Sequence, residues 1–369
     1  MAEVRFKEVW KIYGEKVEAV KGLNLDIKDG EFVSLLGPSG CGKSSTLRMI
    51  AGLEEISRGE LYIDNRLVNN VEPGERDVAM VFENYALLPH MTVYDNVAFP
   101  LRLSKEDEKV IDKKVREISK ILDLDSILHE RAASLGGGER QRVGIGRALI
   151  RKGSVLLMDE PISHLDADLR TRTRGELARL QKLVGITTVY VTHDQIEALA
   201  MADRIAVMHV GELQQVGTAD DLYYYPANLF VADFVGEPPM NFIPCKLQRK
   251  GKTIRVFAEG FDITLGESDA RKVISGFKGG GVWFGVRPKD VLIKKRGNEN
   301  AVKGTVINFE PGCEHSLIEA NIGEYRILVQ CSPDIVLKEG DVFYLDIVTK
   351  KFHLFDHESE ISIIKRNNE

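Results

Sequence analysis

One octapeptide near the N-terminus constrains the fold of this chain more than any other feature. Residues 37–44 read Gly-Pro-Ser-Gly-Cys-Gly-Lys-Ser and satisfy the pattern G-x-x-x-x-G-K-[ST] at every fixed position. The apolar run Glu31–Leu36 precedes it as a predicted strand, and Lys43–Leu53 follows it as a predicted helix. Such a loop points successive backbone N–H groups inward and adds the positive end of a helix dipole. It is therefore predicted to bind phosphate.

The region around this loop predicts an α/β domain with a mainly parallel sheet, because wholly apolar strands alternate with helical segments. Predicted strands are Val155–Met158, Thr187–Thr192 and Arg204–Met208, and predicted helices are Ser104–Leu124 and Gly138–Ile150. We expect this domain to span residues 1–235.

The residue pattern of the sequence changes at Gly236–Met240, where two prolines and a glycine predict a linker. Short β-like runs separated by glycine turns follow it, and they predict a small β-rich, barrel-like domain over residues 236–369. These runs are Thr253–Ala258, Val282–Val286, Val302–Phe309, Tyr325–Val329 and Val342–Val348.

Composition fits a two-domain globular protein of 369 residues, with 43% hydrophobic and 29% charged residues. The net charge of −6 argues against a nucleic-acid binder, which usually carries a basic stripe. Four scattered cysteines are interpreted as free thiols in a reducing compartment. No apolar run is long enough to span a membrane, and the N-terminus is not typical of a signal peptide. Any role at a membrane would therefore require partners that span it.

A second segment completes a nucleotide site. The apolar strand Val155–Met158 leads directly into Asp159 and Glu160. Asp159, at the carboxyl end of that strand, is predicted to hold Mg²⁺ together with the Ser44 hydroxyl. Glu160 is placed to polarise an attacking water, and Lys43 to reach the β- and γ-phosphates.

The order of further motifs resembles the ATPases of ABC transporters. Five segments carry the resemblance: Tyr13, Val81–Asn96 (the Q-loop segment), Ser134–Arg142 (the signature motif), Ser163–Asp166 (the D-loop) and Val191–Asp194 (the switch-histidine segment). Three C-terminal stretches, Gly236–Phe242, Phe284–Pro288 and Phe352–Asp356, resemble the regulatory domain of maltose-type sugar importers. The resemblance implies a P-loop NTPase domain of the ABC type, with a helical subdomain at about 85–150.

The resemblance also implies an assembly: two ATPase subunits bound head to tail, two transmembrane permeases and, indirectly, an extracytoplasmic solute-binding protein. A homodimer is expected, with a heterodimer as the alternative, at the cytoplasmic face of the membrane. ATP would lie between the loop of one chain and the signature motif of the other.

Residue by residue, the resemblance implies catalytic roles for Glu160, His193 and Glu83 and Mg²⁺ ligation by Ser44, Asp159 and Glu83. The implied nucleotide contacts are Tyr13, Gly37, Pro38, Ser39, Gly40, Cys41, Gly42, Lys43, Ser44 and Ser45, together with Gly136, Gly137, Gly138, Glu139 and Asp166.

Four positions depart from the family pattern. Glu83 and Glu139 stand where the family has Gln, Gly136 where it has Ser, and His164 where it has Asn. Gly144 and Gly146 also replace the usual alanines in the helix that follows the signature. Loss of the serine hydroxyl removes a donor to the γ-phosphate, so we expect slower hydrolysis than in a member with the usual residues.

Other functions remain open at this point. A polyamine, iron or sulfate importer would share the two-domain layout. ABC proteins of DNA repair carry a long coiled coil that this chain lacks, and translation-associated ones normally have two cassettes where this chain has one. A purely regulatory nucleotide-binding protein is disfavoured by the intact Glu160 and His193.

Overall fold

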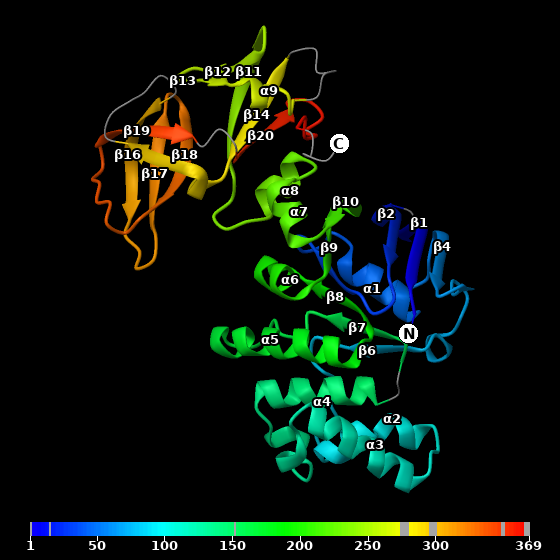
Figure 1. The fold of residues 1–369 in the computed structure, drawn as a ribbon. Helices are drawn as coiled ribbons and strands as arrows, with labels where there is room; N and C mark the ends of the chain where they lie inside the picture. Colours follow the sequence, from blue (N-terminus) through cyan, green and yellow to red (C-terminus); the bar gives the residue numbers. More distant parts are fainter. Residues whose placement is uncertain are drawn as a thin grey trace. The chain divides into compact units, whose positions relative to one another are not determined.

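The structure is a computed structural model that describes residues 2–14, 16–150, 153–273, 280–294, 301–347 and 351–364. The chain folds into two compact units, Met1–Ala219 and Asp220–Glu369 (Figure 1).

The first unit is built on a six-stranded sheet. Its strands, in spatial order, are β10 (Glu212–Gly217), β9 (Arg204–His209), β3 (Phe32–Leu36), β8 (Thr187–Thr192), β7 (Val155–Asp159) and β6 (Val78–Val81). All neighbours are parallel except β10 and β9. The predicted α/β domain with a mainly parallel sheet is therefore confirmed.

Helices cover this sheet on both faces, which explains why its central strands are apolar throughout. On one face Leu156, Met158 and Tyr190 join a core with α4 (Gly137–Leu149) and α5 (Ala167–Val184). On the other face Leu157 and Val189 join a core with α1 (Lys43–Ala51). The helix after the phosphate loop and the helix after the signature motif thus pack on opposite faces of one sheet.

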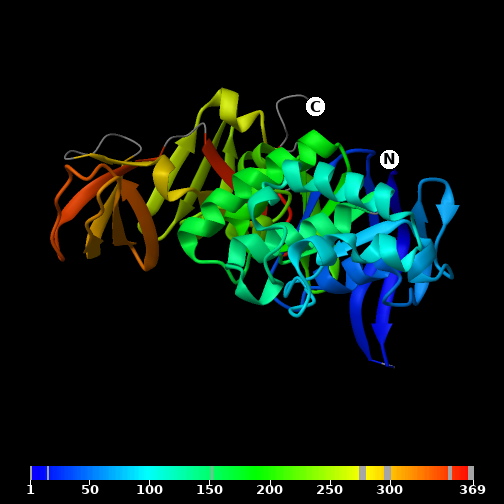
Figure 2. The same ribbon diagram turned by 90° about the horizontal axis from the view of Figure 1, so that it is seen from below.

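A second, antiparallel sheet was not predicted from the sequence. It contains β2 (Val17–Ile27), β1 (Val4–Tyr13), β4 (Arg58–Ile63) and β5 (Arg66–Leu67). Its buried side chains belong to the same core as α1. In Figures 1 and 2 its blue strands lie on the side of the unit away from α5.

The helical region differs from the prediction in its first part. The expected helix 104–124 is shorter, as α3 (Glu108–Ile121), and an unpredicted α2 (Val93–Leu103) precedes it. Helix α2 contains Pro100, a residue that normally ends a helix, so its sequence does not read as helical. Helix α6 (Gln195–Met201) follows β8 in the first unit.

The second unit consists mainly of two five-stranded antiparallel sheets. The first contains β13 (Phe261–Leu265), β12 (Thr253–Ala258), β11 (Asn241–Lys250), β14 (Gly281–Val286) and β20 (Phe352–Asp356). The second contains β15 (Val291–Lys294), β19 (Val342–Ile347), β16 (Ala301–Glu310), β17 (Ser316–Ile322) and β18 (Tyr325–Cys331). Short helices α7 (Ala219–Tyr224), α8 (Leu229–Phe234) and α9 (Glu267–Ala270) accompany them.

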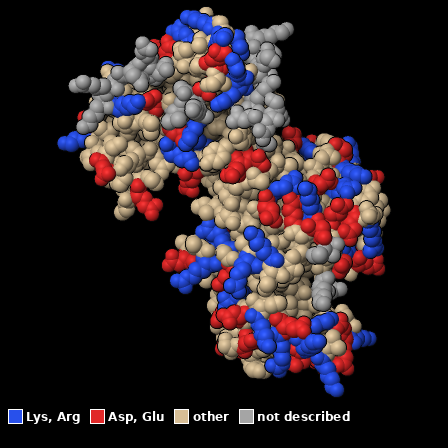
Figure 3. Space-filling view, viewed as in Figure 1, with Lys and Arg blue, Asp and Glu red and all other residues tan. Residues whose placement is uncertain are grey.

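The two sheets of the second unit share one hydrophobic core, which confirms a β-rich domain. All five predicted strands are present, but Val348, the predicted end of the last one, lies outside the described residues. No described helix is long and apolar enough to cross a membrane. On the face drawn in Figure 3, acidic and basic side chains are interspersed, in keeping with the modest net charge.

Candidate nucleotide-binding and hydrolysis site

The phosphate loop joins β3 to α1, as its sequence predicts. Gly42 is the N-cap of α1 with φ 102°, a conformation that L side chains rarely adopt. A Cβ at this position would lie 2.3 Å from the Ala19 carbonyl oxygen, and one at Gly37 would lie 2.2 Å from that of Met208. The loop is thus pressed against backbone on two sides, and only glycine fits at these two positions.

Lys43 is folded back into the loop that contains it. Its buried ammonium donates to the carbonyls of Gly37 at 2.7 Å and Pro38 at 2.9 Å. Among the described residues no carboxylate lies within ion-pair distance of this ammonium. Burying a charge without a counter-charge is costly, so the loop has an unbalanced positive charge that an anionic phosphate group would balance.

Ser44, at the start of α1, contacts Asp159, at the carboxyl end of β7. The Ser44 hydroxyl donates to the Asp159 carboxylate at 3.0 Å. Burial raises the pKa of Asp159, and the carboxylates of Glu160 and Glu83 add to the increase, while the Ser44 hydrogen bond and Arg48 oppose it. A bound divalent cation would relieve this repulsion. No group of three or more acidic, His or Cys side chains within the described ranges forms a complete metal cage. Mg²⁺ suits such a site, because it normally keeps waters and substrate phosphates among its ligands.

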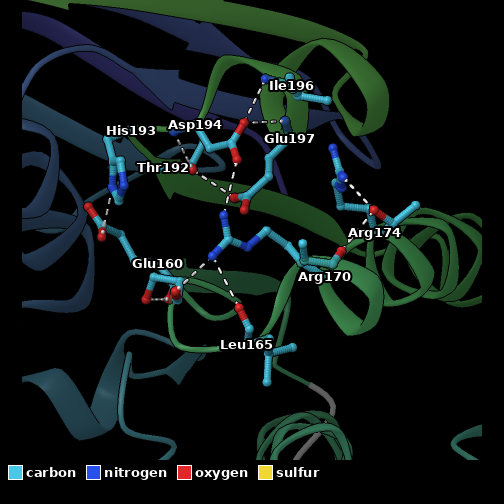
Figure 4. Close-up of polar contacts among 12 residues, drawn as sticks. Glu160, Leu165, Arg170, Arg174, Thr192, His193, Asp194, Ile196 and Glu197 are labelled. Atoms are coloured by element: carbon cyan, nitrogen blue, oxygen red, sulfur yellow. Dashed lines mark hydrogen bonds and ion pairs between the residues drawn. The ribbon is translucent and has the colours of Figure 1, made fainter. Parts of the chain in front are cut away.

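Glu160 and His193 form the second polar pair of the site (Figure 4). Nδ1 of His193 lies 3.1 Å from Oε2 of Glu160. Glu160 follows β7 and His193 follows β8, so the parallel pairing of these strands brings both to one edge of the sheet. The backbone of Glu160 has φ 46°, an uncommon value for a residue with a side chain, and its N–H donates to the Val191 carbonyl.

Arg170, which the sequence analysis did not single out, ties the D-loop to the switch-histidine segment. From α5 its guanidinium donates to the carbonyls of Ser163 at 3.2 Å and Leu165 at 3.1 Å. It also lies 3.6 Å from the carboxylate of Asp194 (Figure 4). The only signal in the sequence was an arginine one helical turn after Asp166, the N-cap of α5.

Two of the four unusual positions contact each other. Oε1 of Glu83, in the Q-loop segment after β6, lies 3.1 Å from Nε2 of His164 in the D-loop after β7. Strands β6 and β7 are parallel neighbours, which explains how residues 81 positions apart in sequence meet. The Glu83 carboxylate therefore has two roles here: it contacts His164, and its negative charge helps to raise the pKa of Asp159.

The other two unusual positions also contact each other. The backbone N–H of Gly136 donates to the Glu139 carboxylate at 2.8 Å, which caps the start of α4. The N–H that the resemblance assigns to a partner's phosphate thus already has an anionic partner within its own chain.

The glycines within α4 have a packing role. A Cβ at Gly144 would lie 3.3 Å from Cβ of Tyr85, and one at Gly146 would lie 3.0 Å from Cδ1 of Leu122. Arg147, on the same helix, donates to the carbonyls of Tyr85 and Ala86 at 2.7 Å each. Helix α4 therefore packs closely against the Q-loop segment.

The predicted residues form two separate groups. The phosphate loop, Asp159, Glu160, His193 and Glu83 lie along the carboxyl ends of neighbouring parallel strands. The Tyr13 hydroxyl lies 3.1 Å from that of Ser45, so this ring belongs to the same group. The signature residues Gly136–Glu139 begin α4 on the other face of the sheet. Within the described part of the chain, no hydrogen bond joins them to the chain's own phosphate loop.

Comparison with known proteins agrees with this geometry. Residues 20–163 match the ABC transporter family, and residues 236–291 match the MalK OB fold domain. The trehalose/maltose import ATP-binding protein MalK of Thermococcus litoralis is 46% identical over 96% of this chain and 98% of its own length. The oligosaccharides import ATP-binding protein MsmX of Bacillus subtilis is 43% identical over 98% of this chain and all of its own length.

A solved structure shows the same fold in the first unit. It is a dimeric ATP-binding cassette in a post-hydrolysis state with ADP and phosphate, 35% identical to this chain, with a TM-score of 0.52. The match covers 58% of this chain and 98% of that one. The chain belongs to the ATP-binding subunits of ABC transporters. It is an ATPase that uses ATP and Mg²⁺, and its second unit contains the OB fold domain of the MalK type.

The Glu83–His164 contact predicts energetic coupling between the two positions. We expect Glu83→Gln and His164→Asn each to lower the ATPase rate about two- to fivefold, because the first change removes the carboxylate charge from the contact and the second removes the imidazole. The double variant, which restores the family's usual amides, should lose less activity than the product of the two single effects. Steady-state ATPase rates of the four proteins test this coupling, and strictly multiplicative effects would refute it.

Proposed function

We propose that this chain is the motor subunit of a sugar or oligosaccharide importer. The main support for this proposal is the similarity to sugar-import ATP-binding proteins, which extends over both units. Relatives named for trehalose/maltose import and for oligosaccharide import match 96% and 98% of the chain. The UgpC protein of Brucella abortus, named for sn-glycerol-3-phosphate import, is 46% identical over 82% of this chain. That compound is therefore the second candidate substrate.

Within the site, each side chain is given the role that its contacts support. Lys43 and the N–H groups of Gly37–Ser44 would bind the phosphates, and Tyr13 would stack on the base. Ser44 and Asp159, with Glu83 beside them, would hold Mg²⁺, which neutralises charge on the phosphate oxygens. Glu160 would orient and deprotonate the attacking water, and His193 would fix the Glu160 carboxylate through their 3.1 Å contact.

The separation of the two residue groups supports a shared site between two copies of the chain. Because α1 and α4 cover opposite faces of the sheet, Gly136–Glu139 cannot complete the chain's own phosphate loop without rearranging the core. In the proposed head-to-tail homodimer these residues, and Asp166, would instead approach the nucleotide of the other subunit. ATP would then favour the closed dimer, and hydrolysis would release it.

The proposal also covers the wider assembly. Two transmembrane permeases would bind the ATPase dimer through the Q-loop segments after β6, so that the chain would work at the cytoplasmic face of the membrane. A solute-binding protein would deliver the sugar from outside. The compact units divide at 219/220, whereas the match to the OB fold domain begins at residue 236. We place the functional boundary at 235/236, with a helical subdomain at about 85–150 and a regulatory domain at 236–369.

Reconstitution tests the proposed substrate class. The chain is to be co-purified with its permeases and placed in vesicles with the cognate binding protein. ATP-dependent uptake of labelled maltose, trehalose or a longer oligosaccharide is the expected result. Uptake of sn-glycerol 3-phosphate, spermidine, iron or sulfate, with no sugar uptake, would contradict the sugar assignment while leaving the ATPase assignment intact.

A further inference from the structure

The second unit contains a small cavity that the proposed function does not use, with both charged and aromatic side chains in its wall. It has a volume of about 150 Å³, room for several water molecules or one small metabolite. Three basic side chains line it (Lys272, Arg287 and Lys351), with one carboxylate, Asp290. The aromatic rings of Tyr223, Tyr224, Tyr225 and Phe352, the His353 imidazole and Ile364 complete the wall.

The most unusual group in this wall is Arg287, which is only 2% exposed. Its guanidinium donates to the carbonyls of Ala232, Val235 and Tyr223, and it stacks on the Tyr223 ring with Cζ 4.1 Å from the ring centre. Its Nε is buried without a hydrogen-bond partner. Burial lowers the pKa of Arg287, which indicates that the protein pays a desolvation cost for the charge.

No carboxylate among the described residues lies within ion-pair distance of Arg287. The carboxylates of Asp290 and Asp233 are near enough to act on it electrostatically, but neither contacts it. Carbonyl oxygens at the end of α8 offset part of the charge. A buried cation next to a cavity, with no counter-ion, is the arrangement expected where a ligand supplies the negative charge.

Two lysines and a histidine add donors at the same cavity. Lys272 lies 2.9 Å from Asp269, and Lys351 lies 2.7 Å from Asp290, so salt bridges orient both ammonium groups and leave each with further N–H donors. His353 has no hydrogen-bond partner among the described residues. Its burial lowers its pKa to about 4, so the ring is neutral near pH 7, with one donor and one acceptor nitrogen.

We propose that this cavity is a binding site for a small phosphate-bearing anion, with Lys272 and Lys351 as direct phosphate contacts and Arg287 as the buried charge that favours the anion. The exposed rings of Tyr224 and Tyr225 flank the cavity and suit a ligand with a carbon skeleton, such as a sugar phosphate, better than the free ion. A lysine ammonium bound to a phosphate forms a charge-assisted hydrogen bond, so each lysine contributes substantially to affinity.

Calorimetric titration of the full chain tests the proposal. The phosphate loop must first be filled with saturating MgADP, because it would otherwise bind the same ligands. Glucose 6-phosphate is expected to bind with one-to-one stoichiometry, inorganic phosphate more weakly, and glucose not at all. Lys272→Met and Lys351→Met should each weaken binding about tenfold. Lys303→Met, at an exposed position on β16, is the matched control and should leave affinity unchanged.

The outcomes separate the ligand sources and the alternative role of Arg287. If inorganic phosphate binds as tightly as glucose 6-phosphate, the site is assigned to the free ion. If neither ligand binds, or if the lysine variants bind as well as the parent, the proposal is wrong and Arg287 is only an anchor for α8. Near-ultraviolet circular dichroism shows whether each variant is folded. Because the readout is binding itself, the result does not depend on which substrate the transporter imports.

Discussion

Replacing Glu160 with glutamine is expected to lower the ATPase rate at least about a hundredfold, the largest effect predicted for any single change in this chain. Glu160 lies where β7 ends, 3.1 Å from His193 and next to Asp159. The amide keeps the size of the side chain but cannot accept a proton from water, and loss of a general base typically costs two to four orders of magnitude. Phosphate release under single-turnover conditions measures the effect.

Binding measurements distinguish a catalytic effect from a structural one. The Glu160→Gln protein should bind MgATP about as tightly as the parent, because the phosphate loop and the Ser44–Asp159 contact are unchanged. It should also accumulate an ATP-bound dimer, visible by size-exclusion chromatography, since the closed state is no longer released by hydrolysis. A rate within threefold of the parent would show that Glu160 is not the base.

The second large effect is expected from the unorthodox signature motif. The combined change Gly136→Ser and Glu139→Gln should raise the ATPase rate of the assembled transporter about ten- to a hundredfold. The serine restores a hydroxyl donor, and the glutamine removes a carboxylate that holds the Gly136 N–H at 2.8 Å. One hydrogen bond to a charged group is worth about 1.5–3 kcal/mol, which corresponds to that range of rates.

The single variants show which part of the change matters. Glu139→Gln alone should give part of the gain, because an amide oxygen can still cap α4 but no longer repels the phosphate of a partner's nucleotide. Glu139→Ala serves as a control, since it removes the cap as well as the charge and is expected to destabilise the start of α4. An unchanged rate in the double variant would mean that Gly136 and Glu139 are tolerated replacements without an effect on catalysis.

The phosphate loop and the central strands were predictable because their signals are local. Gly37–Ser44 specifies its own conformation, and β7 and β8 are apolar throughout because both faces of the sheet are covered. The same reasoning missed α2, whose Pro100 contradicts local helix rules. It also missed the antiparallel sheet of β1, β2, β4 and β5. Strands β1 and β2 form a local hairpin, but the sheet is completed by β4, whose Ile63 pairs with the distant Val4.

The sequence by itself determined the class of site: a phosphate loop, an Asp159–Glu160 pair after an apolar strand, and the family to which their order belongs. Only the tertiary structure decided which of the unusual residues act together. Glu83 meets His164 because β6 and β7 are parallel neighbours. Arg170, on α5, joins the D-loop to Asp194 through its contacts with both segments. The cavity around Arg287 likewise collects residues from 223 to 364. Such contacts join segments far apart in the chain, so no local pattern encodes them.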